Sequence, residues 1–246
     1  MLSKTQVKYI QSLLHKKFRE EYGQFIVEGP KMASEAIALS PADIINIYAC
    51  NDWISTNQSI DKDLAQKIVE VSAQEMEKIS AQHTPSGVLV LLRKPSLSLP
   101  RGWDGLTLVL DGIQDPGNLG TIIRTADWFG VRHIICGTGT ADCYNPKVIQ
   151  STMGSIFRVR LFYEDLNSFF DQNSKIPIAA TSLEGEPLRA AEKWETLFLV
   201  IGNESQGVQQ DIINRAQRKI LIPRTGHGES LNAAVATGIV LYELSK

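Results

Sequence analysis

The stretch that decides the fold is Leu110-Asp-Gly-Ile-Gln-Asp-Pro-Gly-Asn-Leu-Gly-Thr-Ile-Ile-Arg-Thr-Ala-Asp127. An apolar strand is expected before it at residues 106–110, and its second half has the apolar spacing of a helix over 119–129. Further strands are expected at 133–136, 157–161, 176–180, 197–201 and 219–222, and further helices at 148–154, 165–171, 208–217 and 231–244. Strands that alternate with helices predict an α/β domain with a parallel sheet, whose ligand site lies beyond the carboxyl ends of the strands.

The loop between the first strand and its helix has the composition of an anion site. Asn118 is expected to be the N-cap of the helix, and the free amides of the first turn can bind a phosphate. Arg124, two turns into the helix, can contact the same phosphate. The alternative is a capped helix in which Arg124 pairs with Asp127. The glycine spacing matches neither a dinucleotide-binding loop nor a P-loop.

Two more loops of unusual composition follow the strands at 197–201 and 219–222. In the first, Gly202 lets the chain turn, and Glu204 either complements the dipole of the next helix or holds a polar ligand. In the second, Ser230 is expected to be the N-cap of the last helix. Of the 14 residues at 231–244, ten are Leu, Ala, Val, Ile or Tyr. A helix that is apolar nearly all round is buried, so a partner subunit in a twofold dimer is expected to cover it.

The chain divides at residues 94–105, where two prolines, two glycines and two serines exclude a helix or a central strand. Residues 1–93 are expected to form a small α/β domain, and residues 106–246 the larger one. The smaller domain is expected to start with one helix that carries Val7 to Phe18 at helical spacing. It continues with strands at 25–27, 44–50 and 88–92 and helices at 30–39 and 64–68.

The composition excludes several classes of protein. The 246 residues carry 25 basic and 27 acidic side chains, a net charge of −2, which excludes a uniformly basic nucleic-acid binder. The apolar runs are too short for a membrane helix of roughly 20 residues. Three widely spaced cysteines and four scattered histidines match no disulfide framework or metal site, so a reducing cytoplasmic location is expected.

Basic residues nevertheless gather in two short stripes. One is in residues 215–224, which include Arg224 and no acid, and the other is at the start of the chain, with Lys4, Lys8, Lys16, Lys17 and Arg19. Such stripes are the expected contacts for the phosphates of a nucleic acid. The alternative for each stripe is a solvated helix face.

The three loops resemble motifs 1, 2 and 3 of the SpoU (TrmH-like) branch of the SPOUT RNA methyltransferases, over about residues 105–246. The matching patterns are Asn118-Leu-Gly-x-x-x-Arg124-x-Ala126, Gly202-Asn-Glu204-x-x-Gly207 and Ile222-Pro223-x-x-Gly226-x-x-x-Ser230-Leu-Asn232-x-x-x-Ala236. The N-terminal part is similar to the L30e-like substrate-binding domain that precedes many of these enzymes, through Phe25-Ile-Val-Glu-Gly29 and Thr84-Pro-Ser-Gly87. Family members often have Met where this chain has Arg224, which implies a different contact there, to the cofactor or to RNA.

The resemblance implies transfer of a methyl group from S-adenosylmethionine to a ribose 2′-hydroxyl of RNA, with ribosomal (23S) RNA favoured over transfer RNA. It implies a deep trefoil knot over residues 196–235 and a homodimer formed through the knotted domain and the C-terminal helix. The implied cofactor contacts are Gly202, Ile222 and Leu231, and the implied catalytic set is Asn118, Arg124, Glu204, Ser230 and Asn232. The alternatives are an inactive RNA-binding homologue, a transfer RNA 2′-O-methyltransferase and an unrelated nucleotide-dependent enzyme.

Overall fold

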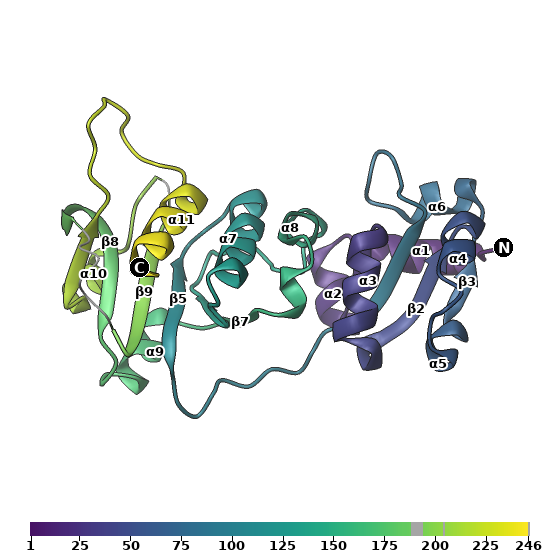
Figure 1. Cartoon of the computed structure of the whole chain (residues 1–246), viewed down its shortest axis with the longest axis horizontal. Helices are drawn as coiled ribbons and strands as arrows, with labels where there is room; N and C mark the ends of the chain where they lie inside the picture. The colour runs from purple at the N-terminus through teal and green to yellow at the C-terminus, as the bar shows by residue number, and fades with distance from the viewer. Residues whose placement is uncertain (188–193, 204, 246) are drawn as a thin grey trace. The chain divides into compact units, whose positions relative to one another are not determined.

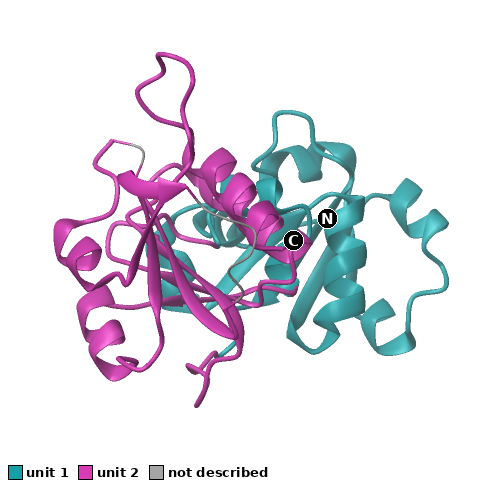
Figure 2. Cartoon of the chain, turned by 60° about the vertical axis from the view of Figure 1, so that its left-hand side comes forward, with its two compact units in different colours: residues 1–96, 144–157 teal, residues 97–143, 158–246 magenta. Residues whose placement is uncertain are grey.

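The computed structural model describes residues 1–187, 194–203 and 205–245. The chain forms two compact units, shown in teal and magenta in Figure 2. Unit 1 contains residues 1–96 and 144–157, and unit 2 contains residues 97–143 and 158–246. Residues 144–157 therefore belong to the unit built by the N-terminal residues, whereas the sequence pattern groups them with the larger domain.

Unit 1 contains a mixed sheet of four strands in the order β1-β4-β2-β3 (Figure 1). The strands are β1 (Gln24–Glu28), β2 (Ile44–Ala49), β3 (Ile68–Glu70) and β4 (Val88–Arg93). The helices are α1 (Lys4–Ser12), α2 (Lys16–Tyr22), α3 (Pro30–Leu39), α4 (Asn51–Thr56), α5 (Lys62–Ala65) and α6 (Ala73–Ile79). Phe25 and Val27 face one core and Ile26 the other, so β1 is buried on both faces of the sheet.

The N-terminal helix expected through Phe18 is two helices, because the chain breaks at residues 13–15 between α1 and α2. Arg19 stabilises this break: its Nη1 donates to the carbonyl of Leu13 at 2.8 Å. Residues 64–68, expected to be a helix, contain the end of α5 and the start of β3.

Residues 144–157 pack against β1 of unit 1 through α8 (Pro146–Thr152) and against α3 through the 3-10 helix Ser155–Phe157. Ile149 joins the apolar cluster of Phe25, and the Tyr144 and Phe25 rings lie 4.6 Å apart. Gly154 has a φ of +100°, and a Cβ built there would lie 2.8 Å from Glu35 Cγ. These contacts explain why this segment leaves the unit that its neighbours in sequence build.

Unit 2 contains a sheet of six parallel strands, in the order β10-β8-β9-β5-β6-β7. The strands are β5 (Gly105–Asp111), β6 (His133–Cys136), β7 (Arg160–Tyr163), β8 (Ile178–Pro187), β9 (Thr196–Gly202) and β10 (Arg218–Leu221). The helices are α7 (Pro116–Trp128), α9 (Leu166–Gln172), α10 (Gln210–Arg215) and α11 (Ala233–Leu244). The predicted α/β fold with a parallel sheet is confirmed.

Helices cover both faces of this sheet. Side chains of α9 and α10 pack with Val109 of β5 in one apolar cluster, and α7 and α11 lie side by side on the other face (Figure 1). The central strands β5 and β9 pair in register from Gly105 with Thr196 to Asp111 with Gly202. Asp111 and Gly202 are therefore neighbours at the carboxyl edge of the sheet. No helix in the described parts of the chain is long and apolar enough to cross a membrane.

Candidate functional site

The site begins at the carboxyl ends of β5 and β9, where the Asp111 carboxylate is buried, with 3% of its surface exposed. Its two oxygens accept hydrogen bonds from the backbone N–H of Gln209, at 2.7 Å, and from the Gln209 side-chain amide, at 2.5 Å. Gln209 is the N-cap residue of α10. The carboxylate therefore ties the far end of the loop after β9 to the end of β5.

The loop after β9 also closes on itself. The backbone groups of Asn203 and Gly207 exchange two hydrogen bonds, at 3.1 and 2.8 Å. The Asn203 side chain donates to the carbonyl of Gly112 at 2.8 Å and accepts from the N–H of Ser205 at 2.8 Å. A Cβ at Gly202 would lie 2.2 Å from the carbonyl carbon of Gly207, so only glycine fits there. Glu204, an expected site residue in this loop, lies outside the described residues.

Asn118 lies in the first turn of α7 and is not its N-cap, contrary to the prediction. The N-cap is Asp115, whose side chain accepts from the N–H of Asn118 at 2.8 Å. Ser230 is likewise not the cap of α11: Asn232 is, because its Oδ1 accepts from the N–H groups of Ala234 and Val235. Asn and Asp cap as well as Ser, and the backbone path decides between candidates a few residues apart.

The two asparagines join loops that are 114 residues apart in the sequence. The Asn232 side-chain amide donates to Oδ1 of Asn118 at 2.8 Å. The start of α7 and the start of α11 are thereby held together, with polar groups of both exposed. This bond brings two members of the expected catalytic set into contact.

Arg124 is exposed on α7, two turns after the start of the helix. The alternative pairing with Asp127 is absent: Asp127 pairs with Arg158 at 2.8 Å, and among the described residues Arg124 makes no ion pair. A guanidinium without a protein partner keeps all of its donors for an anion.

The loop before α11 is exposed from Pro223 to Asn232. Arg224 Nη1 donates to the carbonyl of Gly228 at 2.9 Å, which closes the loop across four residues. Of the expected cofactor contacts, Ile222 is half-buried and Leu231 is 48% exposed. Ser230, from the expected catalytic set, is exposed. Two apolar side chains are therefore accessible at the ends of a polar loop.

The surface of unit 1 carries the expected N-terminal basic stripe with one exception. Lys4, Lys8, Lys16 and Lys17 are exposed on α1 and α2. Arg19 is 2% exposed, and its guanidinium donates to the Leu13 carbonyl, so the expected RNA contact at Arg19 is wrong. The helical pattern did not separate Arg19 from its exposed neighbours because the break after α1 turns it inward.

The profile of the SpoU rRNA methylase family matches residues 105–242, and that of the MRM3-like substrate-binding domain matches residues 4–90. The chain belongs to the SpoU rRNA methylase family. The members are S-adenosylmethionine-dependent ribose 2′-O-methyltransferases, so the predicted reaction class and cofactor are confirmed for this chain. The three loops described above lie within the matched residues 105–242, and the loop after β5 contacts both of the others, through Gly112 and Asn118.

Several relatives match this SpoU protein along nearly its whole length. A Bacillus subtilis protein named 23S rRNA (guanosine(2553)-2′-O)-methyltransferase RlmP is 31% identical, covering 97% of this chain and 95% of its own. A structure of a putative TrmH-family RNA methyltransferase from Porphyromonas gingivalis has a TM-score of 0.86 and 33% identity, covering 99% and 98%. An AdoMet-bound rRNA methyltransferase from Sinorhizobium meliloti has a TM-score of 0.87 and 28% identity, covering 99% and 96%.

Three residues that hold this SpoU site together were missed in the sequence: Asp111, Asn203 and Gln209. Asp111 had a usable signal, since it is a carboxylate directly after a buried apolar strand, where an unpaired charge is costly. Asn203 and Gln209 had none, because an amide in a polar loop does not indicate which backbone group it contacts.

Proposed function

We propose that this protein methylates a ribose 2′-hydroxyl of 23S ribosomal RNA and acts in the cytoplasm. The substrate is supported by the name of the Bacillus subtilis relative, which matches both units of this chain. The three free cysteines fit a reducing compartment. The reaction centre is supported by the hydrogen bond between Asn118 and Asn232 and by the exposed Arg124 on the same helix as Asn118, which makes no ion pair among the described residues.

The residues present fit S-adenosylmethionine. Ile222 and Leu231 offer accessible apolar side chains for its adenine, and Gly202 allows the tight loop whose backbone groups would hold its polar parts. When bound, the cofactor supplies a methyl group on a sulfonium, which is already a good leaving group. The protein therefore has to align the attacking hydroxyl and help it to lose its proton, and alignment alone contributes several kcal/mol.

In this proposal Arg124 binds the phosphate next to the target ribose and polarises the hydroxyl. A guanidinium stays protonated in proteins, so Arg124 is not the base. Asn118, Glu204, Ser230 and Asn232 orient the ribose. Lys4, Lys8, Lys16 and Lys17 of unit 1, and Arg224 of unit 2, contact RNA phosphates. A trefoil knot over residues 196–235 is part of the proposal, supported by the family and by the contacts between the three loops.

A homodimer completes the proposal. On α11 the apolar residues Val235, Ile239 and Tyr242 are 52%, 42% and 56% exposed, at helical spacing along one face. The other face of α11 packs on α7, so the stripe lies on the opposite, exposed face of the helix. Apolar stripes of this kind on a helix are typical of subunit interfaces.

The test is methyl transfer to a 23S rRNA transcript by the purified protein and by Arg124→Ala. We expect one 2′-O-methylated nucleotide with the native protein and loss of turnover in the variant, with cofactor affinity by calorimetry within about twofold, since Arg124 serves the RNA. Equal losses of turnover and cofactor affinity would contradict the role given to Arg124. A mark on transfer RNA alone would overturn the substrate.

A further inference from the structure

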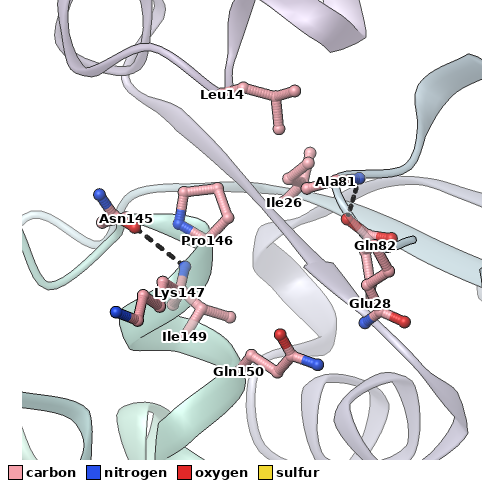
Figure 3. A pocket seen from close by; sticks show the side chains of 10 residues that line it. All are labelled: Leu14, Ile26, Glu28, Ala81, Gln82, Asn145, Pro146, Lys147, Ile149 and Gln150. Atoms are coloured by element: carbon pink, nitrogen blue, oxygen red, sulfur yellow. Dashed lines mark hydrogen bonds between the residues drawn. The ribbon is translucent and has the colours of Figure 1, made fainter. Parts of the chain in front are cut away.

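Unit 1 contains a pocket of about 460 Å³ that no part of the transfer reaction uses (Figure 3). It lies between the edge strand β1 and α8, and the loop after α6 forms a third wall. Its lining includes Ile26 and Glu28 of β1, Ala81 of the loop after α6, and Asn145, Ile149 and Gln150 of the segment that contains α8. Pockets of this size bind small organic groups, and this one has the usual mixture of apolar wall and convergent polar groups.

Internal hydrogen bonds hold the walls in place. The Glu28 carboxylate accepts from the Ser80 hydroxyl and, at 2.8 Å, from the N–H of Ala81, so the loop after α6 is anchored to the end of β1. Asn145 caps α8 by accepting from the N–H of Lys147 at 2.9 Å. The bonds from Ala81 to Glu28 and from Lys147 to Asn145 are the two dashed lines in Figure 3. The pocket is therefore formed without a ligand.

The groups that face the pocket match the edge of a nucleobase. In Figure 3 the Gln150 amide extends from α8 toward the side of β1, and it has no hydrogen-bond partner among the described residues. The Asn145 side chain uses its oxygen in the cap and leaves its NH₂ group as a donor. Ile26 and Ile149 are buried in the apolar wall. Amide donors and acceptors above an apolar wall read an unstacked base, which is how proteins recognise single-stranded RNA.

The charges beside the pocket favour a nucleotide within an RNA strand over a neutral ligand. Lys147 lines the pocket itself. Leu14 also lines it, and the exposed Lys16, which pairs with Glu20 at 3.5 Å, and the exposed Lys17 follow Leu14 by two and three residues. The acid of the pocket, Glu28, has both oxygens engaged by its own loop. Exposed cations next to a pocket attract the phosphates on either side of an extruded base.

We propose that this pocket binds one unpaired, splayed-out base of the RNA substrate, with its neighbouring phosphates on Lys16 and Lys17. The inference rests on the proposed function only in taking RNA as the substrate. It assigns a specificity-determining contact to α8, a helix from the middle of the methyltransferase sequence that packs in unit 1. Site selection would then depend on a base other than the one whose ribose is methylated.

The test is ultraviolet crosslinking of the full-length protein to total bacterial RNA, with mass spectrometry of the peptides that carry a nucleotide. We expect adducts within residues 80–82 or 145–150. Ala81→Trp, which places an indole in the pocket from an exposed position, should lower this crosslink at least fivefold, because a stacked base contributes about a fivefold to hundredfold gain in affinity. Ala65→Trp, at an exposed position on α5 outside the pocket, is the matched control and should leave it unchanged.

A second pair of variants measures the amide contact by filter binding. Gln150→Ala should weaken RNA binding about threefold to tenfold, the usual loss for one polar contact, while Gln74→Ala, exposed on α6, should not. Crosslinks confined to other peptides, or equal effects of the pocket and control variants, would overturn the pocket. Methyl transfer to the 23S transcript is scored separately. Pocket adducts without 23S methylation would overturn the proposed substrate and support the base-binding pocket. Methylation of 23S RNA without pocket adducts would overturn the pocket and support the proposed substrate.

Discussion

The Asp111 carboxylate gives the sharpest prediction about how the site is assembled. Asp111→Asn keeps the shape of the side chain and removes its charge. Both hydrogen bonds from Gln209 lose their charge assistance, and the Gln209 amide has to turn so that its oxygen faces the new NH₂ group. Charge-assisted bonds contribute about 1.5–3 kcal/mol each and neutral ones about 0.5–1.5, so the two bonds together lose about 2 kcal/mol.

A loss of this size is easily measured. In proteins of this size each kcal/mol lowers Tm by about 2–4 °C, so we expect a decrease of about 4–8 °C by scanning calorimetry. The freed loop must also be ordered again when the cofactor binds. Because 1.4 kcal/mol is a factor of about ten in affinity, a loss of about 2 kcal/mol should raise the dissociation constant for S-adenosylmethionine by up to about thirtyfold.

The control for this prediction is Asp171→Asn. Asp171 pairs with Arg215 at 2.6 Å, but its side chain is 67% exposed, and exposed pairs contribute about 0–1 kcal/mol. Its effect on Tm should be small, and cofactor affinity should not change. If Asp111→Asn melts and binds the cofactor as the native protein does, the carboxylate does not hold the loop and the reasoning is refuted.

Three further predictions concern other parts of the molecule. Gly202→Ala places a Cβ 2.2 Å from the Gly207 carbonyl carbon, so cofactor binding by calorimetry should fall at least tenfold. Ile239→Asp puts a charge into the exposed stripe of α11, so analytical ultracentrifugation should find the variant as a monomer and the native protein as a dimer. Burial, and then Arg160, lowers the pKa of His133, so the unfolded chain binds more protons below about pH 6.5. The contribution of His133 to stability should therefore be constant above that pH and should decrease as the pH drops from there to the lowered pKa. His133→Gln should reduce this decrease in Tm at acidic pH.

Each of these predictions has a matched control at an exposed or open position. Gly102→Ala places its Cβ in open space, and Leu183→Asp puts the same charge on a residue that is 72% exposed in β8. His15→Gln changes an exposed histidine of unit 1. A control that loses cofactor binding, dimerisation or acid sensitivity to the same extent as its partner would contradict the corresponding explanation.

The sequence predicts the larger unit well, because buried parallel strands are short apolar runs whose ends are marked by glycine and polar residues. The strand expected at 133–136 matches β6, and the helix expected at 165–171 matches α9. Prediction was weaker where structure depends on distant contacts. Residues 144–157 look like any helix in an α/β alternation, and only the contacts of Ile149 and Tyr144 with Phe25 decide which unit they join.

For the candidate site, too, the sequence predicts some features and misses those that depend on distant contacts. Motif spacing predicts Asn118, Arg124 and Asn232 as site residues. It does not predict that Asn232 donates to Asn118, or that Asp115 and Asn232 are the helix caps. The sequence prediction missed α4 and α6 because both helices are short. The signal for such a helix lies at its ends, as in the Ser72–Glu75 capping box at the start of α6. Arg19 was misjudged because a break in the helical pattern changes the face of every residue after it.

The central claim is that the three gathered loops methylate a ribose 2′-hydroxyl of 23S ribosomal RNA. The most direct measurement maps 2′-O-methylated nucleotides in total RNA from cells with and without the gene, and from cells that carry only Arg124→Ala. We expect one 23S position that loses its mark in the deletion and in the variant and regains it with the native gene. A 23S pattern unchanged by the deletion, or a mark lost only from transfer RNA, would contradict it.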